Sequence, residues 1–347
     1  MTEPLKYTLV VDEAEAGRAI KSLLQSKLKV STRLLRQLPG QGIVTRNGEP
    51  TRLNERASKG DIINIMLPFE ASDITPVPMD MDIRYEDEEI LVVNKPAGVL
   101  SHPTARERLG SIQSGIRAYL SKDGRIPHAV HRLDRDTSGL LMFAKHAHVH
   151  HLYDDALRKG LLHRVYMAIV EVGEDADQEG LIARDIWHTV QLPIAEDPTK
   201  PSRRVVDESG QPARTDYRVL STLPLPIHGQ ATRQPKAVAL LQLVLWTGRT
   251  HQIRLHMSAI GLPLVGDQDY PKRAQDGSDT NVWSPLRRQA LHAIQLGWEH
   301  PLTGQPHVVS APPPPDFRSV WRRAGGSDGD FSLLLTDTAA LHHVRIL

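Results

Sequence analysis

The chain has 347 residues, of which 40% are hydrophobic and 24% charged, as in folded globular proteins. It has no cysteine, which excludes disulfides, thiol nucleophiles and cysteine-based metal sites. Its length favours two domains. No apolar run is long enough to span a membrane and no secretory signal precedes the fold, so we expect a cytoplasmic, monomeric protein without a membrane partner. The net charge of +1 means that any nucleic-acid binding must use local basic patches.

Residues 1–70 are predicted to form a small domain with two short helices and a hairpin. The helices break near Val30, where Ser31 or Thr32 can cap the second helix. An Asn47-Gly48 turn then separates a short strand from a closing strand at 61–68. The helices share a set of apolar residues (Leu23, Leu24, Leu28, Leu34, Leu35 and Leu38). Six cations and no acid lie between the two ends of this helical region (Arg18, Lys21, Lys27, Lys29, Arg33 and Arg36). This basic run is either a solvated surface or a binding face.

A stretch rich in Pro, Asp, Ser and Met follows, and we assign residues 71–81 to a linker. The second domain, 82–320, opens with an apolar strand at 90–93 that runs into the turn of Asn94 to Gly98. Lys95 in this turn is either solvated or in contact with a phosphate. A helix is expected at 111–120.

The segment PHAVHRLDRDTSGLLMF, residues 127–143, places Asp134 and Asp136 among three basic residues. A carboxylate that loses water needs cationic or hydrogen-bonding partners, as in many sites of chemistry. The alternative is a polar turn between strands, with Asp and Ser selected for local backbone hydrogen bonds.

Residues 146–159 have the pattern of an amphipathic helix that ends at Gly160. Its four histidines invite a metal-site interpretation (His146, His148, His150 and His151). We expect most of them on the solvent side, without a carboxylate to complete a ligand set, and so predict no metal site.

The run LLHRVYMAIV, residues 161–170, alternates as a strand, with Val165 on one face and Arg164 and Tyr166 on the other. Further strands are expected at 215–220, 237–246 and 289–298. Long helices do not alternate regularly with these strands, which indicates an α+β protein with a large antiparallel sheet and helices on it. The sequence predicts no role for the tail, residues 321–347.

The segment TGRTHQIRLHM, residues 247–257, ends a strand and begins a helix. Thr250 is the expected N-cap and Gly261 the expected C-cap. Arg254 lies at the edge of the buried face, where a guanidinium requires a carboxylate, and Asp134 is the expected partner. Alternatively, Arg249 and Arg254 contact only solvent or helix-end carbonyls.

Four blocks together resemble one known family. HRLDRDTSGLL, TGRTHQIRLH with GLPLVGDQDY, VVNKPAGVLSHP, and RQALHAIQLGWEHPLTG look like the ribosomal-large-subunit type of RNA pseudouridine synthase. They lie within residues 82–304 in the order of the family, and GQPARTDYRVL matches a weaker family segment. The resemblance implies that the catalytic domain has a mixed, mainly antiparallel sheet. Members of the family often carry an S4-like RNA-binding domain in front, which the layout of residues 1–70 resembles.

The resemblance implies roles for particular residues. The catalytic aspartate would be Asp134 rather than Asp136, its basic partner Arg254, and the active-site tyrosine Tyr166. The family more often has lysine where this chain has Arg164. Candidate RNA contacts complete the set (Lys95, His131, Arg132 and Arg249 near the site, and Arg33 and Arg36 in the N-terminal domain).

The implied reaction breaks the N-glycosidic bond of a uridine, turns the base and bonds its C5 to the sugar, without net redox change. It requires no cofactor, and the chain contains neither a phosphate-binding loop nor a dinucleotide fingerprint. A carboxylate is suited to act at a sugar carbon, either by attack at C1′ or by proton removal at C2′. The RNA partner would be ribosomal RNA, with transfer RNA as the alternative. The alternative is an RNA-binding or ribosome-assembly protein without catalysis.

Overall fold

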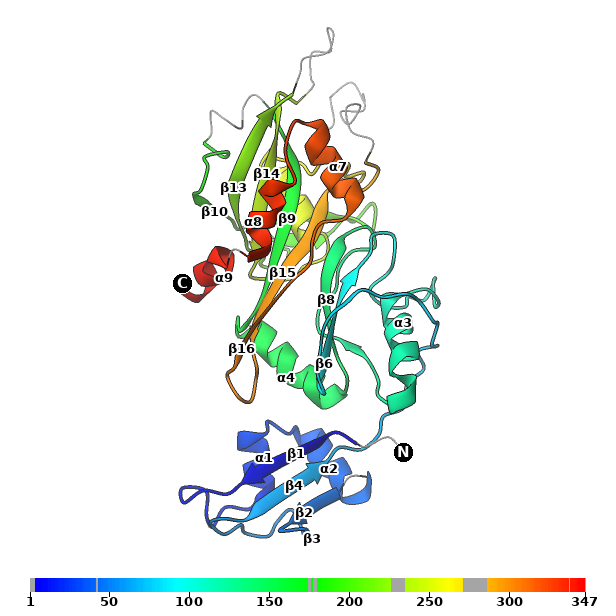
Figure 1. Ribbon diagram of the computed structural model, residues 1–347, viewed down its shortest axis with the longest axis vertical. Coiled ribbons are helices and arrows are strands. Elements are labelled where there is room, and N and C mark those ends of the chain that lie inside the picture. The colour runs from blue at the N-terminus through cyan, green and yellow to red at the C-terminus, as the bar shows by residue number, and fades with distance from the viewer. Residues whose placement is uncertain are drawn as a thin grey trace.

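The computed structural model describes residues 4–41, 43–173, 176, 180–225, 235–270, 286–336 and 338–346. It shows a small N-terminal unit beneath a larger unit built on one long sheet (Figure 1). No residue between the last N-terminal strand, which ends at Met66, and the first strand of the larger unit, which begins at Ile83, lies in a helix or strand.

The N-terminal unit packs two helices, α1 (Ile20–Lys27) and α2 (Thr32–Gln41), on a four-stranded sheet. All six leucines predicted for the helix pair are buried in its core. Ser31 begins α2 by accepting a hydrogen bond at Oγ from the Leu34 amide (3.2 Å), one of the two expected caps. The sheet order is β1-β4-β2-β3, all antiparallel: β1 (Lys6–Val10), β2 (Ile43–Arg46), β3 (Glu49–Pro50) and β4 (Ile62–Met66).

The larger unit has a sheet of order β10-β13-β14-β9-β15-β8-β6-β5, with β16 beside β15 and β7 beside β8. All of its pairs are antiparallel except β15 with β8, so the predicted mixed, mainly antiparallel α+β fold is confirmed. A separate two-stranded ribbon joins β11 (Ile194–Glu196) to β12 (Arg204–Val206). The strands of the sheet are β5 (Ile83–Glu86), β6 (Ile90–Lys95), β7 (His128–Ala129), β8 (Ser138–Ala144), β9 (Leu162–Val172), β10 (Trp187–Val190), β13 (Thr215–Pro224), β14 (Ala237–Leu245), β15 (Leu291–Glu299) and β16 (Pro306–Ser310).

The single parallel pairing depends on Gly139. Its φ is +114°, and a Cβ on it would lie 2.3 Å from the carbonyl oxygen of Ala293 on β15. Only glycine allows both this backbone conformation and this approach. Gly139 therefore lets the segment with Asp134 enter the sheet directly beside β15.

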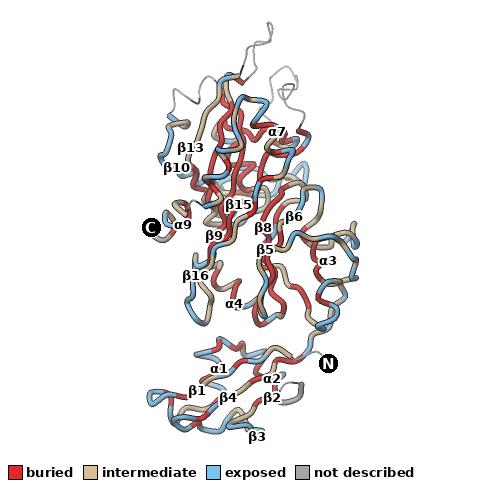
Figure 2. The backbone as a smooth tube through the Cα atoms, viewed as in Figure 1, coloured by how far each residue is buried: buried red, intermediate tan, exposed pale blue. Residues whose placement is uncertain are grey.

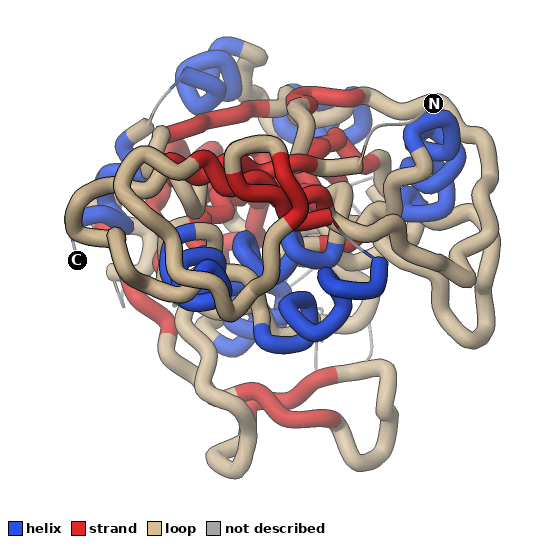
Figure 3. Tube along the Cα trace, turned by 90° about the horizontal axis from the view of Figure 1, so that it is seen from below, coloured by secondary structure: helices blue, strands red, loops and turns tan. Residues whose placement is uncertain are grey.

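Both faces of the central strands are covered. On β9, Val165, Met167 and Ile169 face one core and Tyr166 and Ala168 the other, as the alternation predicted. Buried backbone is concentrated along β9, β15 and their neighbours (Figure 2). Viewed from below, helices lie on more than one side of the strands (Figure 3). The helices are α3 (Ile112–Tyr119) with a 3-10 turn at Leu120–Asp123, α4 (Ala147–Arg158), α6 (Gln252–Ala259), α7 (Pro315–Arg323), α8 (Gly329–Thr336) and α9 (Ala339–Ile346).

The C-terminal residues form part of the core of the larger unit. Side chains from α7, α8 and α9, among them Phe317, Trp321 and Leu341, pack against Val165 and Met167 of β9. From the sequence alone we assign no role to the tail, residues 321–347. In the structure it covers one face of the sheet (Figure 1).

The prediction that most of the four histidines of residues 146–151 face solvent is wrong. His148 is buried against Tyr7 of β1, with the rings edge to face and their centroids 5.4 Å apart. His146 Nε2 lies 3.1 Å from the Pro68 carbonyl oxygen, and His150 Nε2 lies 3.1 Å from that of Ala129. Three of the four side chains therefore contribute to packing in and around the junction between the two units.

We expect Trp321→Ala to lower the free energy of unfolding by about 3–5 kcal/mol, because Trp321 is fully buried on the sheet and its Nε1 donates to Asp330 (2.7 Å). Urea titrations followed by circular dichroism measure this change. Arg323→Ala, an exposed neighbour on α7, serves as the control and should change stability by less than about 0.5 kcal/mol. Equal effects of the two substitutions would contradict the covering role of the tail.

Candidate active site

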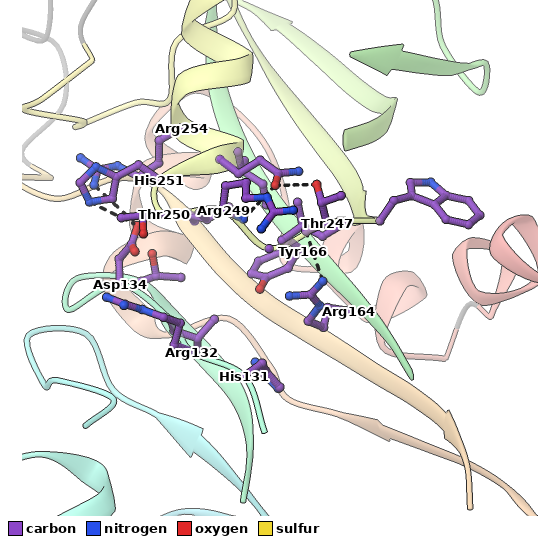
Figure 4. A pocket seen from close by; sticks show the side chains of 18 of the residues that line it. His131, Arg132, Asp134, Arg164, Tyr166, Thr247, Arg249, Thr250, His251 and Arg254 are labelled. Carbon is purple, nitrogen blue, oxygen red and sulfur yellow. Dashed lines mark hydrogen bonds and ion pairs between the residues drawn. The ribbon is translucent and has the colours of Figure 1, made fainter. Parts of the chain in front are cut away.

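A cavity of about 450 Å³ lies between two loops that the sheet brings together. One loop carries His131 to Thr137, before β8, and the other begins at Thr247 after β14 and leads into the first turn of α6, where Arg254 lies. Tyr166 and Arg164 reach the cavity from β9 (Figure 4). The structure therefore places Asp134, Tyr166 and Arg254, the three predicted catalytic residues, around one cavity.

The loop with Asp134 is held in place by hydrogen bonds to the turn that follows β6. Ser101 Oγ donates to the Leu133 carbonyl oxygen (2.6 Å) and accepts from the Leu133 amide (3.0 Å). The Arg135 carbonyl oxygen accepts from the Gly98 amide (3.0 Å). A turn closes the loop, in which the Thr137 amide donates to the Asp134 carbonyl oxygen (3.2 Å). These bonds fix the backbone on both sides of Asp134.

Lys95 belongs to the same support, which corrects its prediction as a solvated or phosphate-binding residue. Its side chain is fully buried, and Nζ donates to the carbonyl oxygens of Pro96 (2.8 Å), Val99 (2.8 Å) and Arg135 (2.9 Å). All three ammonium donors are thus used within the chain. Lys95 holds the Asp134 loop in place and is not available to RNA.

The second loop is organised by Gln252. Its Oε1 accepts from Thr247 Oγ1 (2.8 Å) and from the Arg249 amide (3.0 Å), while Nε2 donates to the Arg214 carbonyl oxygen (2.9 Å). The N-cap of α6 is His251, in the left-handed conformation with φ +59°, and not the predicted Thr250. The left-handed turn redirects the chain so that the side chains of His251 and Arg254 both approach Asp134 (Figure 4).

Arg254 is held mainly by two carboxylates that the sequence analysis did not select. Its Nε and Nη2 bind Asp267 in a two-bond arrangement (2.7 and 2.8 Å), and Nη2 also binds Asp269 (2.9 Å). The nearest approach to Asp134 is 3.6 Å, from Nη1 to Oδ2. Burial opposes the charge of Arg254, but Asp267, Asp134 and Asp269 together raise its pKa. The predicted Asp134–Arg254 ion pair is present, whereas the two-bond grip goes to Asp267.

Because Asp267 and Asp269 bind Nε and Nη2 of Arg254, its third nitrogen, Nη1, points toward Asp134 Oδ2. His251 Nε2 lies 4.0 Å from the same carboxylate oxygen. Asp134 keeps about 20% of its side chain exposed, so it is accessible from the cavity. Burial lowers the pKa of His251, although the nearby Asp134 opposes this shift. The lowered pKa favours the neutral ring. The group that faces the cavity is therefore a carboxylate supported by one arginine.

Tyr166 and Arg164 are neighbours on the same face of β9, and both are buried. Burial raises the pKa of Tyr166, so it presents a neutral phenol to the cavity. Arg164 Nη2 donates to the Thr247 carbonyl oxygen (3.2 Å), which links β9 to the second loop.

The other predicted RNA contacts near the site differ in exposure. Arg132 and Arg249 are exposed at the cavity, as expected for residues that could meet phosphates. His131 is buried, and its Nε2 accepts from the Met142 amide (3.3 Å). Burial lowers the pKa of His131 to about 3, so this ring is neutral at physiological pH and cannot pair with a phosphate. Arg33 and Arg36 are exposed on α2 of the N-terminal unit.

Comparisons with known proteins show which family the chain resembles. A match to the RNA pseudouridylate synthase family covers residues 89–259. The chain is 34% identical to the uncharacterized RNA pseudouridine synthase YhcT of Bacillus subtilis (strain 168), over 90% of this chain and 96% of the relative. The chain belongs to the RNA pseudouridine synthase family. It is thus an enzyme that isomerises uridine in RNA, as the sequence analysis predicted.

Two further comparisons extend this result. The ribosomal large subunit pseudouridine synthase D of Neisseria meningitidis serogroup A / serotype 4A (strain DSM 15465 / Z2491) is 34% identical, over 84% of this chain and 75% of the relative. The structure of human RNA pseudouridylate synthase domain containing 4 matches with a TM-score of 0.53 at 23% identity, over 70% of this chain and 93% of that structure. The structural match shows that the fold is shared.

Two features of the described residues bear on whether the chain is a membrane protein or a metal-binding protein. No described helix is both long and apolar enough to cross a membrane. Within the same residues, no group of three or more histidine, aspartate or glutamate side chains is arranged to hold a metal ion.

Sequence reasoning missed Asp267, Asp269 and Gln252 as parts of the site. The first two stand in the quoted block GLPLVGDQDY, where two acids separated by one residue in an otherwise apolar segment were the available signal. Gln252 is the first residue of α6 and is buried, but it carried no charge to attract notice. Their roles depend on side-chain contacts that no local pattern specifies.

We expect the stability that depends on Lys95 to rise with pH. Burial lowers the pKa of Lys95 to about 7, against the opposing charges of Asp134 and Asp136, whereas an unfolded lysine titrates near 10.4. Between these values the unfolded chain binds one more proton at this residue than the folded chain, so the free energy of unfolding rises by at most about 1.4 kcal/mol per pH unit.

Urea titrations at pH 7 and pH 9 on the wild type and on Lys95→Met measure this effect, because methionine has no proton to lose. The stability of the wild type relative to the variant should increase at the higher pH. A pH-independent difference would show that Lys95 keeps an ordinary pKa in the folded protein.

Proposed function

We propose that Asp134, Arg254 and Tyr166 carry out the isomerisation of uridine to pseudouridine in this enzyme. The observation that supports it is their convergence, from two loops and a strand distant in sequence, on one cavity of about 450 Å³. This volume suits a single base with part of its sugar, of the size class of small-ligand pockets.

In this proposal Asp134 acts at the sugar of a uridine that has left the RNA stack. Arg254, fixed by Asp267 and Asp269, positions Asp134 through its Nη1, which lies 3.6 Å from Asp134 Oδ2. Tyr166 stacks on the uracil and offsets part of the cost of unstacking, which is a few kcal/mol. The neutral phenol can also exchange a proton during the rearrangement. Attack at C1′ and proton removal at C2′ are both compatible with these positions.

We further propose that the substrate is large-subunit ribosomal RNA, because a relative at 34% identity carries that substrate in its name. Loops and RNA shape decide which uridine enters such a site. In our proposal the unit of residues 1–70 is an S4-like RNA-binding domain, joined by a linker at 71–81 to a catalytic domain at 82–320. Its support is the helix pair on a small sheet, with exposed cations on α2 and at the end of α1.

The sequence also suggests phosphate contacts for a second basic run (Arg203, Arg204, Arg214 and Arg218), but the contacts of these side chains within the chain argue against that role. Arg214 grips Asp216 with two hydrogen bonds (3.0 and 2.9 Å), and Arg218 donates to Gln242 (2.7 Å). Arg204 pairs with Glu196 and Arg203 donates to the Asp269 carbonyl oxygen. These side chains are half-buried and bound within the chain, so we assign the phosphate contacts to Arg132 and Arg249 instead.

We expect Asp134→Asn to abolish catalysis and to leave RNA binding intact, because the amide keeps the shape but not the charge. The substrate is total RNA from cells that lack this protein, labelled with tritium at uridine C5, and release of tritium to water measures the reaction. The rate should fall by more than about 10³-fold. Asp136→Asn, in the same loop, is the matched control and should stay near the wild-type rate. An Asp134→Asn enzyme with full activity would refute the proposed mechanism.

We expect Arg33→Ala combined with Arg36→Ala to weaken RNA binding without changing the rate at saturating RNA. Each lost phosphate contact reduces the slope of log affinity against log salt by about one unit. Filter binding of a large-subunit ribosomal RNA transcript at several salt concentrations measures this slope. Lys59→Ala, whose charge is paired with Glu13 in the same unit, is the control. Unchanged affinity of the double variant would remove α2 from the RNA-binding surface.

A further inference from the structure

Arg164 is a buried cation on β9. Only about 5% of its surface is exposed, and it lines the cavity beside Tyr166 (Figure 4). Its Nη2 donates to the Thr247 carbonyl oxygen, whereas Nε has no hydrogen-bond partner. Among the described residues no carboxylate pairs with it. Arg254 and Arg288, by contrast, each bind a carboxylate through two hydrogen bonds.

Such an arrangement is costly in the free protein. A guanidinium that leaves water normally needs a paired anion to offset its desolvation. Burial accordingly lowers the pKa of Arg164, and its positive charge adds to the burial that lowers the pKa of His131. This part of the cavity therefore has an uncompensated positive potential, which suits a negative charge that arrives with the substrate.

The position of Arg164 favours the base over a phosphate as the source of that charge. Arg132 and Arg249 are exposed and accessible to a phosphate that stays hydrated. Arg164 lies deeper, on the same face of β9 as Tyr166, the residue assigned to stack on uracil. A base that leaves the RNA stack is the group that reaches this depth.

We propose that Arg164 binds the uracil anion that forms when the C1′–N1 bond breaks, and holds it while the base turns. This inference rests on the proposed function of the site. The electron pair of the broken bond stays on the base and spreads over N1, O2 and O4, so the guanidinium stabilises a charge that is absent from the bound uridine. Stabilising charge that develops during the reaction accelerates it.

The step balances without an added reactant. The base first leaves with the electron pair of the C1′–N1 bond. Its C5 then uses an electron pair of the ring to bond C1′. At the same time the Asp134–C1′ ester bond breaks or, on the other route, the C1′–C2′ double bond takes back the proton that Asp134 removed from C2′. The C5 proton is then lost, and N1 gains a proton. No electrons leave the system, and the uracil anion forms whether Asp134 attacks C1′ or removes a proton from C2′.

Gly248 offers an independent way to disturb Arg164. A Cβ on Gly248 would lie 2.7 Å from Arg164 Nη1, and its φ is not in the left-handed region. Gly248→Ala therefore displaces the guanidinium, the flexible end of a long side chain, without straining the backbone. The position of Arg164 can thus be changed while its charge is kept.

The test compares Arg164→Gln, Arg164→Lys and the wild type in single-turnover tritium release, with the same C5-labelled total RNA. We expect Arg164→Gln to lower the rate at saturating enzyme by about 10²–10³-fold, the effect of removing one donor to a developing anion. The enzyme concentration that gives half of the maximal rate, which reports the affinity for RNA, should change by less than about threefold. Arg164→Lys, which keeps the charge, should stay within about tenfold of the wild type.

Gly248→Ala should lower the same rate, and the Arg164→Gln/Gly248→Ala enzyme should be no slower than Arg164→Gln alone. Such non-additivity means that both substitutions act through one guanidinium. Thermal unfolding of each variant checks that the fold is kept. If Arg164→Gln does not fold, Gly248→Ala carries the test. A lowered rate in Gly248→Ala that the Arg164→Lys/Gly248→Ala enzyme does not lower additively supports the inference, whereas a wild-type rate in Gly248→Ala overturns it.

Two other results would also overturn it. Weakened RNA binding with a normal saturated rate would make Arg164 a phosphate contact, and wild-type values for both would make it structural. The Asp134→Asn experiment separates these results from failure of the proposed function. Should Asp134→Asn be inactive while Arg164→Gln has the wild-type rate, only the role of Arg164 is wrong.

Discussion

The arrangement of charges around Arg254 is the interaction on which the site depends. Asp267 and Asp269 bind two of its nitrogens, so the guanidinium keeps one orientation and offers the third nitrogen to Asp134. A buried arginine without these acids would carry a large desolvation cost. With them, its charge is stable inside the protein and its direction is fixed, which a single pair with Asp134 could not achieve.

The need to hold Asp134 and Arg254 in fixed positions explains why many contacts of the fold support the two loops around the cavity. Lys95 and Ser101 hold the Asp134 loop by hydrogen bonds, and Gln252 joins the second loop to the start of β13. Gly139 permits the parallel contact that brings β8 beside β15. On the opposite face, the C-terminal helices bury the other side of β9, so the strand that carries Tyr166 and Arg164 is held from behind.

The two buried arginines of the cavity have different surroundings. Arg254 has its anions in the free protein, whereas Arg164 has none among the described residues. We relate this difference to their roles: one cation positions a carboxylate before the reaction, and the other is available for charge that appears during it. A preorganised site pays this electrostatic cost when the chain folds rather than at each turnover.

The sequence by itself determined the family, the α+β class, the alternation of β9 and the identity of Asp134, Tyr166 and Arg254 as candidates. These features are local, since strand alternation and short motifs are written in neighbouring residues. Tertiary structure decided the partners. That Arg254 is gripped by Asp267, that Lys95 is buried under the Asp134 loop, that His148 packs on Tyr7, and that the tail covers β9 all depend on contacts between segments far apart in the chain. No local period encodes such contacts, because burial and charge pairing are set by the whole packed fold.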